Sequence, residues 1–366
     1  MTLEDDPAKD FSFLLQPQSY HPLPPATTTT PVPFQKPPST DVPLEALLHK
    51  GYYTLAATTA LGELLASPAP PLPRIITLFH IRLLALSLLP HTLPLAALES
   101  KILGDLSSPI YLTSASTGGQ THILPFSLRI LATRLQSHAD GSWRRGVAGL
   151  YDLAREARLH ATSATASNIR AKWSTHLQDL GLNIASALVE VGDHDGAGRL
   201  LDTMRPPILT PNAANPRLDR HHLYRALIYL RLGDVSAALS LFPAESTTPN
   251  AQVVRALALV ANGAYTESST AFRNLIQHDA PHKELLFSNL ATSLLYTGDV
   301  QAARTLYEEL VTDGFRFHGL TFNLSTVYEL CAGGNTAQTL KEQLASKLAE
   351  RDVEYGWEKS DIDFKL

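Results

Sequence analysis

Cysteine is almost missing from this chain of 366 residues, because Cys331 is the only one. A single cysteine excludes an internal disulfide and is typical of a protein kept in a reducing compartment such as the cytosol. The opening sequence MTLEDDPAKD is acidic at the place where a secretory signal peptide carries a basic segment. We therefore expect a cytoplasmic protein without such a signal.

Long apolar runs are lacking as well. The longest extends from Ile75 to Leu89 and has 15 residues, whereas a membrane-spanning helix needs about 20. His80 and Arg82 interrupt this run, and Pro90 follows it. The pattern predicts a buried helix of the protein core rather than a membrane span.

Neither positive nor negative charge dominates the composition. The chain contains 30 Lys and Arg residues against 35 Asp and Glu residues, which gives a formal net charge of −5. Nucleic-acid binding depends on a concentrated basic face. We therefore expect no nucleic-acid partner.

The sequence signatures of common catalytic sites are absent too. There is no phosphate-binding G-x-x-x-x-G-K-[ST], no G-x-S-x-G turn, no H-E-x-x-H and no pair of cysteines. On this basis we assign no catalytic and no cofactor-binding residues, and we expect that the protein is not an enzyme.

A few histidine and aspartate groupings deserve a test as metal sites. His221 and His222 are adjacent, so their side chains would point about 100° apart on a helix. His278 and His282 have a suitable spacing but a proline lies between them. The run Asp193–Asp195 stands in a turn, where capping of the next helix accounts for at least one carboxylate. We predict no metal site.

What the chain does have is a recurring glycine. Four times a Gly closes one apolar helical stretch and is followed by a second, alanine-containing stretch: Gly192-Asp193, Gly233-Asp234, Gly263-Ala264 and Gly298-Asp299. The intervals between these glycines are 41, 30 and 35 residues, close to the ~34 of a tetratricopeptide array. A repeat array is a surface for holding other proteins.

The fourth repeat, from Glu284 to Val311, shows why the segments should pair. Before the glycine, leucines recur every four residues, which places them on one face of a helix: Leu286, Leu290 and Leu294. After it, a small and two large residues share one face of a second helix: Ala303, Tyr307 and Leu310. Gly298 can end the first helix and Asp299 can cap the second. The repeat therefore predicts an antiparallel helical hairpin.

One hairpin cannot cover both of its apolar faces, so neighbouring hairpins must stack. We predict an all-α, tetratricopeptide-like α-solenoid of about seven or eight helical hairpins over residues 42–353. Residues 1–41 contain nine of the 25 prolines and should be disordered, although the apolar cluster from Phe11 to Leu15 could be a docking peptide. The stretches 107–122 and 205–216 should be loops, and residues 354–366 a C-terminal tail, either a cap or a ligand.

Four segments also resemble subunit 12 of the trafficking protein particle (TRAPP) complex: Ile123–Gln136, Asn168–Asp193, Ser288–Val300 and Leu320–Leu330. Together with other pieces the resemblance covers most of residues 42–353. The pieces PFSLRIL and TFNLSTVYEL are the most specific, because the repeat pattern alone does not require Pro125, Phe126, Asn323 or Glu329. The chain differs from longer relatives in having only about 41 residues before the array.

The resemblance implies a non-catalytic scaffold subunit of a TRAPP III-type tethering complex, which acts in ER-to-Golgi traffic and autophagy. As a whole that complex promotes nucleotide exchange on a Rab GTPase, which this subunit would meet only indirectly. Its partners would be other TRAPP subunits, especially the large subunits of the peripheral arms. It would be cytoplasmic and peripheral on early secretory (ER–Golgi intermediate and Golgi) membranes, reaching them only through the complex.

Candidate partner contacts follow from these interpretations. The candidates are Asn289, Asn323, Glu329, Tyr355 and Trp357. Asn323 and Glu329 could instead form hydrogen bonds within the array. Phe322 has the size and spacing of a core residue. Two other functions stay open. One is an adaptor that clamps the carboxylate tail of a chaperone, for which Asn289 is of the right type, and the other is a tetratricopeptide subunit of a vesicle coat.

Overall fold

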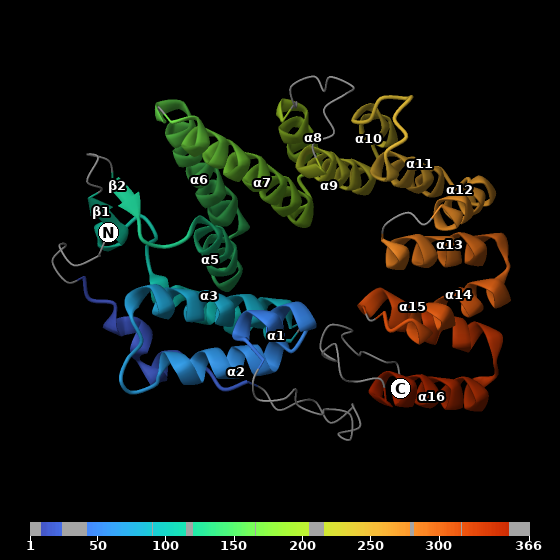
Figure 1. Ribbon diagram of the computed structural model, residues 1–366, viewed down its shortest axis with the longest axis horizontal. Helices are drawn as coiled ribbons and strands as arrows, with labels where there is room; N and C mark the ends of the chain where they lie inside the picture. Colours follow the sequence, from blue (N-terminus) through green and yellow to red (C-terminus); the bar gives the residue numbers. More distant parts are fainter. Residues whose placement is uncertain are drawn as a thin grey trace. The chain divides into compact units, whose positions relative to one another are not determined.

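The computed structural model of the chain describes residues 9–23, 42–89, 91–114, 120–164, 166–204, 216–278, 282–315 and 317–350. In these ranges it has sixteen α-helices and one two-stranded sheet (Figure 1). The chain divides into two compact units, one up to Leu150 and the other from Tyr151 to Leu348. Each unit is described by itself. Among the described residues, no helix combines the length and the apolar character needed to cross a bilayer.

The first unit is a series of helices in which each packs on the next. They are α1 (Leu44–Lys50), α2 (Tyr53–Leu64), α3 (Leu72–Leu88), α4 (Leu93–Ser100), α5 (Phe126–Ala139) and the first turns of α6 (Trp143–Ser163). The apolar run Ile75–Leu89 forms α3, and its side chains Leu78, Phe79 and Leu83 are completely buried. The expectation of a core helix is therefore confirmed.

The predicted loop 107–122 contains regular structure that the sequence did not indicate. Strands β1 (Leu112–Ser114) and β2 (Gln120–His122) pair in antiparallel register, with Leu112 opposite His122. The imidazole of His122 stacks on the buried ring of Tyr111, at 5.6 Å between centroids. The predicted loop 205–216 falls almost wholly outside the described residues.

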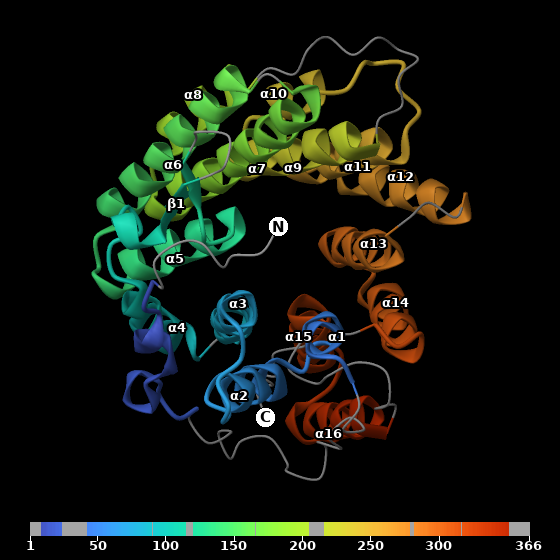
Figure 2. The ribbon, with the colours of Figure 1, turned by 60° about the vertical axis from the view of Figure 1, so that its left-hand side comes forward.

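The second unit contains the repeats. Its helices are α7 (Ser167–Val191), α8 (His194–Thr203), α9 (Pro216–Leu232), α10 (Val235–Ser240), α11 (Pro249–Ala261), α12 (Tyr265–Gln277), α13 (Lys283–Thr297), α14 (Val300–Thr312), α15 (His318–Cys331) and α16 (Gly334–Glu350). From α7 to α15 each helix contacts its neighbours along the chain, and Figure 2 shows α13 to α16 following one another in this way. This sequential packing is that of an α-solenoid, so the predicted fold class is confirmed.

The turn at Gly298 explains how each hairpin closes. Gly298 has φ of 91°, in the left-handed region that costs a residue with a side chain about 1–2 kcal/mol. Its N–H bonds to Leu295 O at 3.1 Å, and the N–H of Asp299 bonds to Leu294 O at 2.9 Å. These two bonds satisfy carbonyls at the end of α13. The same pair of bonds recurs at Gly192, Gly233 and Gly263.

The aspartates after three of these glycines cap the following helices, as predicted. The carboxylate Oδ1 of Asp299 accepts the N–H of Ala302 at 3.1 Å. Asp193 and Asp234 do the same for Gly196 and Ala237, at 2.8 and 2.9 Å. The interpretation of Asp193 as a cap rather than a metal ligand therefore has direct support.

The residues predicted to pack inside the fourth hairpin, and those at matching positions of the other hairpins, are buried. The small residues, Ala185, Ala197, Ala226, Ala256, Ala291 and Ala303, are all at 0% exposure. The large ones, Phe242, Phe272, Tyr307 and Leu310, lie at 8%, 0%, 0% and 0%. Alanine at the contact allows two backbones to approach, while the ring from the second helix fills the remaining space.

The disorder predicted for residues 1–41 is wrong for residues 9–23. This segment forms two short 3-10 helices, Ser12–Leu15 and Pro17–Ser19, and it buries Phe11, Leu14 and Tyr20 in the core of the first unit. We call residues 9–23 the N-terminal strap. Its proline content suggested disorder, but three bulky side chains and a polar contact with distant helices stabilise it. The rest of residues 1–41 lies outside the described residues.

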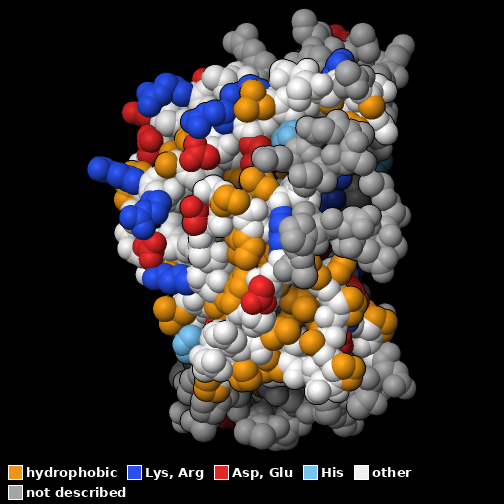
Figure 3. All heavy atoms as spheres, turned by 90° about the vertical axis from the view of Figure 1, so that its left-hand side faces the viewer, with side chains coloured by type: hydrophobic (Ala, Val, Ile, Leu, Met, Phe, Trp, Pro, Cys, Tyr) orange, Lys and Arg blue, Asp and Glu red, His pale blue; other side chains and the backbone are white. Residues whose placement is uncertain are grey.

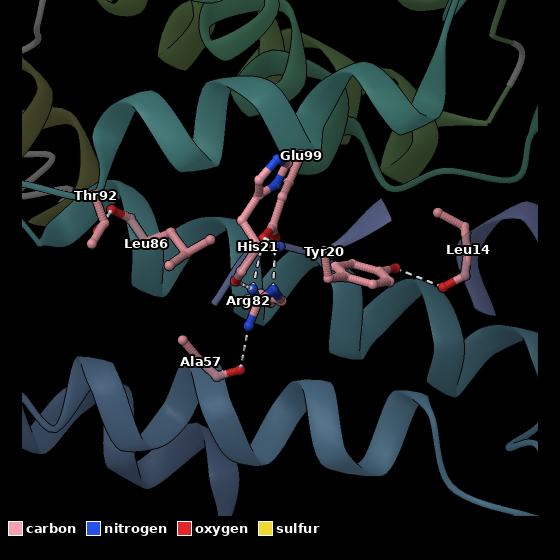
Figure 4. A network of polar contacts seen from close by, with 8 residues as sticks. All are labelled: Leu14, Tyr20, His21, Ala57, Arg82, Leu86, Thr92 and Glu99. Carbon is pink, nitrogen blue, oxygen red and sulfur yellow. Dashed lines mark hydrogen bonds and ion pairs between the residues drawn. The ribbon is translucent and has the colours of Figure 1, made fainter. Parts of the chain in front are cut away.

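That polar contact is a buried ion pair. Arg82 of α3 and Glu99 of α4 are 1% and 0% exposed and lie 2.6 Å apart (Figure 4). Glu99 accepts the backbone N–H of His21 at 3.0 Å, and Arg82 donates to the backbone O of His21 at 3.1 Å. The pair therefore holds both backbone groups of one strap residue, which explains why two charges without access to water are tolerated.

Candidate interaction surface

The sequence-predicted contact residues that can be placed lie on α13 and α15, and each already bonds within the second unit. The amide of Asn289 donates to Leu285 O of its own helix at 2.8 Å. The amide of Asn323 donates to the hydroxyl of Tyr307 at 3.2 Å. Glu329 accepts from Lys341 of α16 at 2.6 Å. Their role in partner contacts stays a prediction, and Tyr355 and Trp357 lie outside the described residues.

The bond of Asn323 is part of a network across three helices. The Tyr307 hydroxyl of α14 also lies 3.1 Å from Oγ1 of Thr292 on α13. Thr292 of α13 and Asn323 of α15 therefore both point toward the Tyr307 hydroxyl of α14. The network fixes how successive hairpins stack.

Three large apolar side chains are exposed on this part of the unit. Tyr296 of α13 is 66% exposed, and Phe322 and Leu330 of α15 are 41% and 65% exposed. The ring of Tyr265, at the start of α12, stacks on Tyr296 with centroids 4.4 Å apart and planes at 7°. We call Tyr265, Tyr296, Phe322 and Leu330 the α13–α15 apolar surface.

Helical periodicity explains why these residues are not buried. The buried side of α15 carries Leu320, Thr321, Leu324, Ser325, Val327 and Tyr328. At 100° per residue, Phe322 and Leu330 each fall about 140° from the centre of that side. Tyr296 lies likewise opposite the buried leucines of α13. The expectation that Phe322 packs in the core is therefore wrong. Reading each helix for apolar residues outside its core face would have identified these positions from the sequence.

The polar groups beside this surface are paired with one another. The hydroxyl of Tyr328 donates to Oε1 of Glu308 at 3.1 Å, and Arg304 lies 2.9 Å from the same carboxylate. Burial, and secondly the charge of Glu308, raises the pKa of Tyr328. Cys331 is half-buried, with the amide of Gln301 at 3.7 Å from its Sγ.

Within the part of the chain that the structure describes, no group of three or more His, Cys, Asp or Glu side chains is placed to hold a metal ion. His222 is buried, at 2% exposure, and its ring meets Phe242 edge-on. Burial, then the charge of Arg225, lowers the pKa of His222.

No family model matches the chain, and no curated protein matches it. Among solved structures, the chain is similar to a tetratricopeptide repeat protein from Parabacteroides merdae, with 16% sequence identity and a TM-score of 0.39. The match covers 71% of this chain and 87% of that one. A likeness at this level carries no argument, so the fold assignment rests on the hairpins described above. The resemblance to TRAPP subunit 12 stays a prediction.

Proposed function

We propose that this protein is a non-catalytic scaffold subunit of a TRAPP III-type tethering and Rab exchange complex, acting in ER-to-Golgi traffic and autophagy. Arrays of stacked helical hairpins typically present binding surfaces for other proteins. Such a subunit works by holding partners, here the large subunits of the peripheral arms, and meets the Rab GTPase only indirectly.

The observation that carries the proposal is the position of the α13–α15 apolar surface. Tyr296 lies within Ser288–Val300, and Phe322 and Leu330 lie within Leu320–Leu330, two of the four segments that resemble TRAPP subunit 12. Exposed aromatic and aliphatic side chains are frequent anchors at protein interfaces. A stable partner would bury about 800 Å² on this chain, far more than these side chains alone.

The proposal is tested by affinity purification of the tagged full-length chain from cell extract, followed by identification of the associated proteins. We expect TRAPP subunits at stoichiometric amounts. Recovery of coat subunits, or of a heat-shock chaperone released by a free acidic C-terminal peptide, would instead favour one of the two other functions. The chaperone function has the weaker basis, because the amide of Asn289 is already bonded to its own helix.

A further inference from the structure

The hairpin of α6 and α7 differs from the others in its charge. Residues 157–178 contain Arg158, Arg170 and Lys172 and no Asp or Glu, in a chain with a formal net charge of −5. We call residues 157–164 and 166–173, which include the last turns of α6 and the first turns of α7, the α6–α7 tip. Figure 3 shows Lys and Arg side chains in the upper half of one face, with Asp and Glu side chains among them, at the height of α6 and α7 in Figure 1.

The ends of the two helices contact each other at the tip, and most of the tip's described residues are exposed. The rings of His160 and Trp173 stack with centroids 4.5 Å apart, which joins the end of α6 to the start of α7. Beyond this contact, every residue from 166 to 172 is exposed. A helix that is exposed on all sides extends beyond the packed part of its unit, because packing would bury at least one face.

The cations of the tip are not neutralised by the described part of the chain. No carboxylate lies within ion-pair distance of Arg158 or Lys172 there, and the guanidinium of Arg170 donates to the backbone O of Ala164 at 2.9 Å. Arg155, two residues before the tip, pairs with Asp152 of its own helix at 2.9 Å, and within the tip Nε2 of His160 lies 3.9 Å from the carboxylate of Glu156.

Two large aliphatic side chains accompany these cations. Leu159 and Ile169 are 64% and 49% exposed, and Leu159 points away from the buried Ala157 on α6. Single exposed leucines are common on protein surfaces. Here, however, the two aliphatic side chains stand among cations without carboxylate partners at the end of a projecting hairpin. Apolar and basic side chains combined in this way are typical of segments that insert at the surface of an anionic bilayer.

We propose that the α6–α7 tip binds the surface of membranes containing anionic phospholipids. Arg158, Arg170 and Lys172 would meet headgroup phosphates, while Leu159 and Ile169 enter the boundary of the acyl chains. A flat, negatively charged surface fits a projecting tip, whereas recognition of an acidic peptide needs a groove to receive it. The proposal goes beyond the scaffold function, in which the membrane is reached only through partner subunits.

The test uses the purified full-length chain and sedimentation with vesicles of phosphatidylcholine alone or mixed with phosphatidylserine. We expect binding only to the mixed vesicles, and weaker binding as salt rises. Each Lys or Arg near such a surface strengthens binding about fivefold, so Arg158→Gln/Lys172→Gln should weaken it roughly 25-fold. Leu159→Ser/Ile169→Ser should weaken the binding that persists at higher salt.

The matched control is Arg231→Gln/Arg273→Gln, which removes two exposed cations from other helices of the same unit and should leave binding unchanged. Unchanged thermal melting of all variants shows that folding is intact. Equal loss in control and tip variants, no binding of the native chain to mixed vesicles at low salt, or equally tight binding to an acidic peptide or an oligonucleotide would overturn the proposal. No partner subunit is present, so the result is independent of the TRAPP assignment.

Discussion

At the scale of single residues, the least expected feature is the buried pair of Arg82 and Glu99. Neither charge has access to water, and each side chain forms hydrogen bonds with groups that are distant in the sequence. Arg82 reaches Ala57 O of α2 at 3.1 Å as well as the backbone of His21. The pair thereby joins α2, α3, α4 and the N-terminal strap.

Removing one partner of this pair should be costly. Glu99→Gln leaves the guanidinium of Arg82 buried without its counter-charge, so we expect a loss of about 3–5 kcal/mol of unfolding free energy. Limited proteolysis should then cut within the N-terminal strap. The matched control is Glu63→Gln, which breaks an exposed ion pair with Arg74 and should cost at most about 1 kcal/mol. Equal effects of the two substitutions would contradict this role of Glu99.

His222 should make the second unit sensitive to acid. Its pKa is lowered from the usual 6.5 by burial and then by the charges of Arg225 and His221, opposed by Asp219. As the pH falls below about 6.5, His222 therefore binds a proton in the unfolded chain before it does so in the folded chain, and the folded state loses stability. Above about 6.5 His222 is neutral in both states, and its contribution to stability is fully present. Melting at pH 7 and 5.5 should show a smaller decrease for His222→Met than for the native chain, and an unchanged decrease for the exposed control His194→Gln. A decrease that is the same in His222→Met would contradict the assignment.

At the scale of elements, the helix caps allow a comparison within one molecule. The backbone angles at Asp193, Asp234 and Asp299 are nearly those at Ala264, where φ is −82° and ψ is 64°. Ala264 has no side chain that can cap α12. An aspartate there should reach the N–H three residues on, as its counterparts do.

We therefore predict that Ala264→Asp raises the unfolding free energy by about 0.5–1 kcal/mol, and that Asp299→Ala lowers it by about 1 kcal/mol. Denaturant midpoints of the two variants and the native chain measure both changes. Destabilisation by Ala264→Asp would show that the turn after Gly263 is not equivalent to the others.

These elements also show what the sequence could and could not predict. The turns at Gly192, Gly233, Gly263 and Gly298 are local, since a few consecutive residues determine each helix end, and all four turns were predicted. The N-terminal strap depends on Arg82 and Glu99, which no local pattern connects with residues 9–23. The strands β1 and β2 were missed because each has only three residues.

The candidate surface was predicted only in its location. The sequence directed attention to α13 and α15 through Asn289, Asn323 and Glu329, and each of them bonds within the unit. The exposed apolar residues beside them were overlooked, because a bulky residue in an amphipathic helix is usually a core residue. Applying the helical period to α15 would have separated Phe322 and Leu330 from that core, because both fall outside its buried side.

At the scale of the whole molecule, the chain is an array of helical hairpins whose described part offers two unlike surfaces in its second unit. One is apolar and lies on α12, α13 and α15; the other is basic and lies at the α6–α7 tip. We assign the first to partner proteins and the second to a membrane surface. The two assignments rest on different residues, and each has a separate experiment that could contradict it.

The most direct test of the central claim, that the array binds partner proteins through the α13–α15 apolar surface, is affinity purification of Tyr296→Ser/Leu330→Ser beside the native chain. The control variant, Leu88→Ser/Leu98→Ser, removes two leucines of the first unit that are 46% and 45% exposed. We predict that TRAPP subunits recovered with the native chain and the control fall at least tenfold with Tyr296→Ser/Leu330→Ser, because truncating interface anchors costs about 2 kcal/mol or more. Equal recovery of those subunits by all three proteins would contradict it.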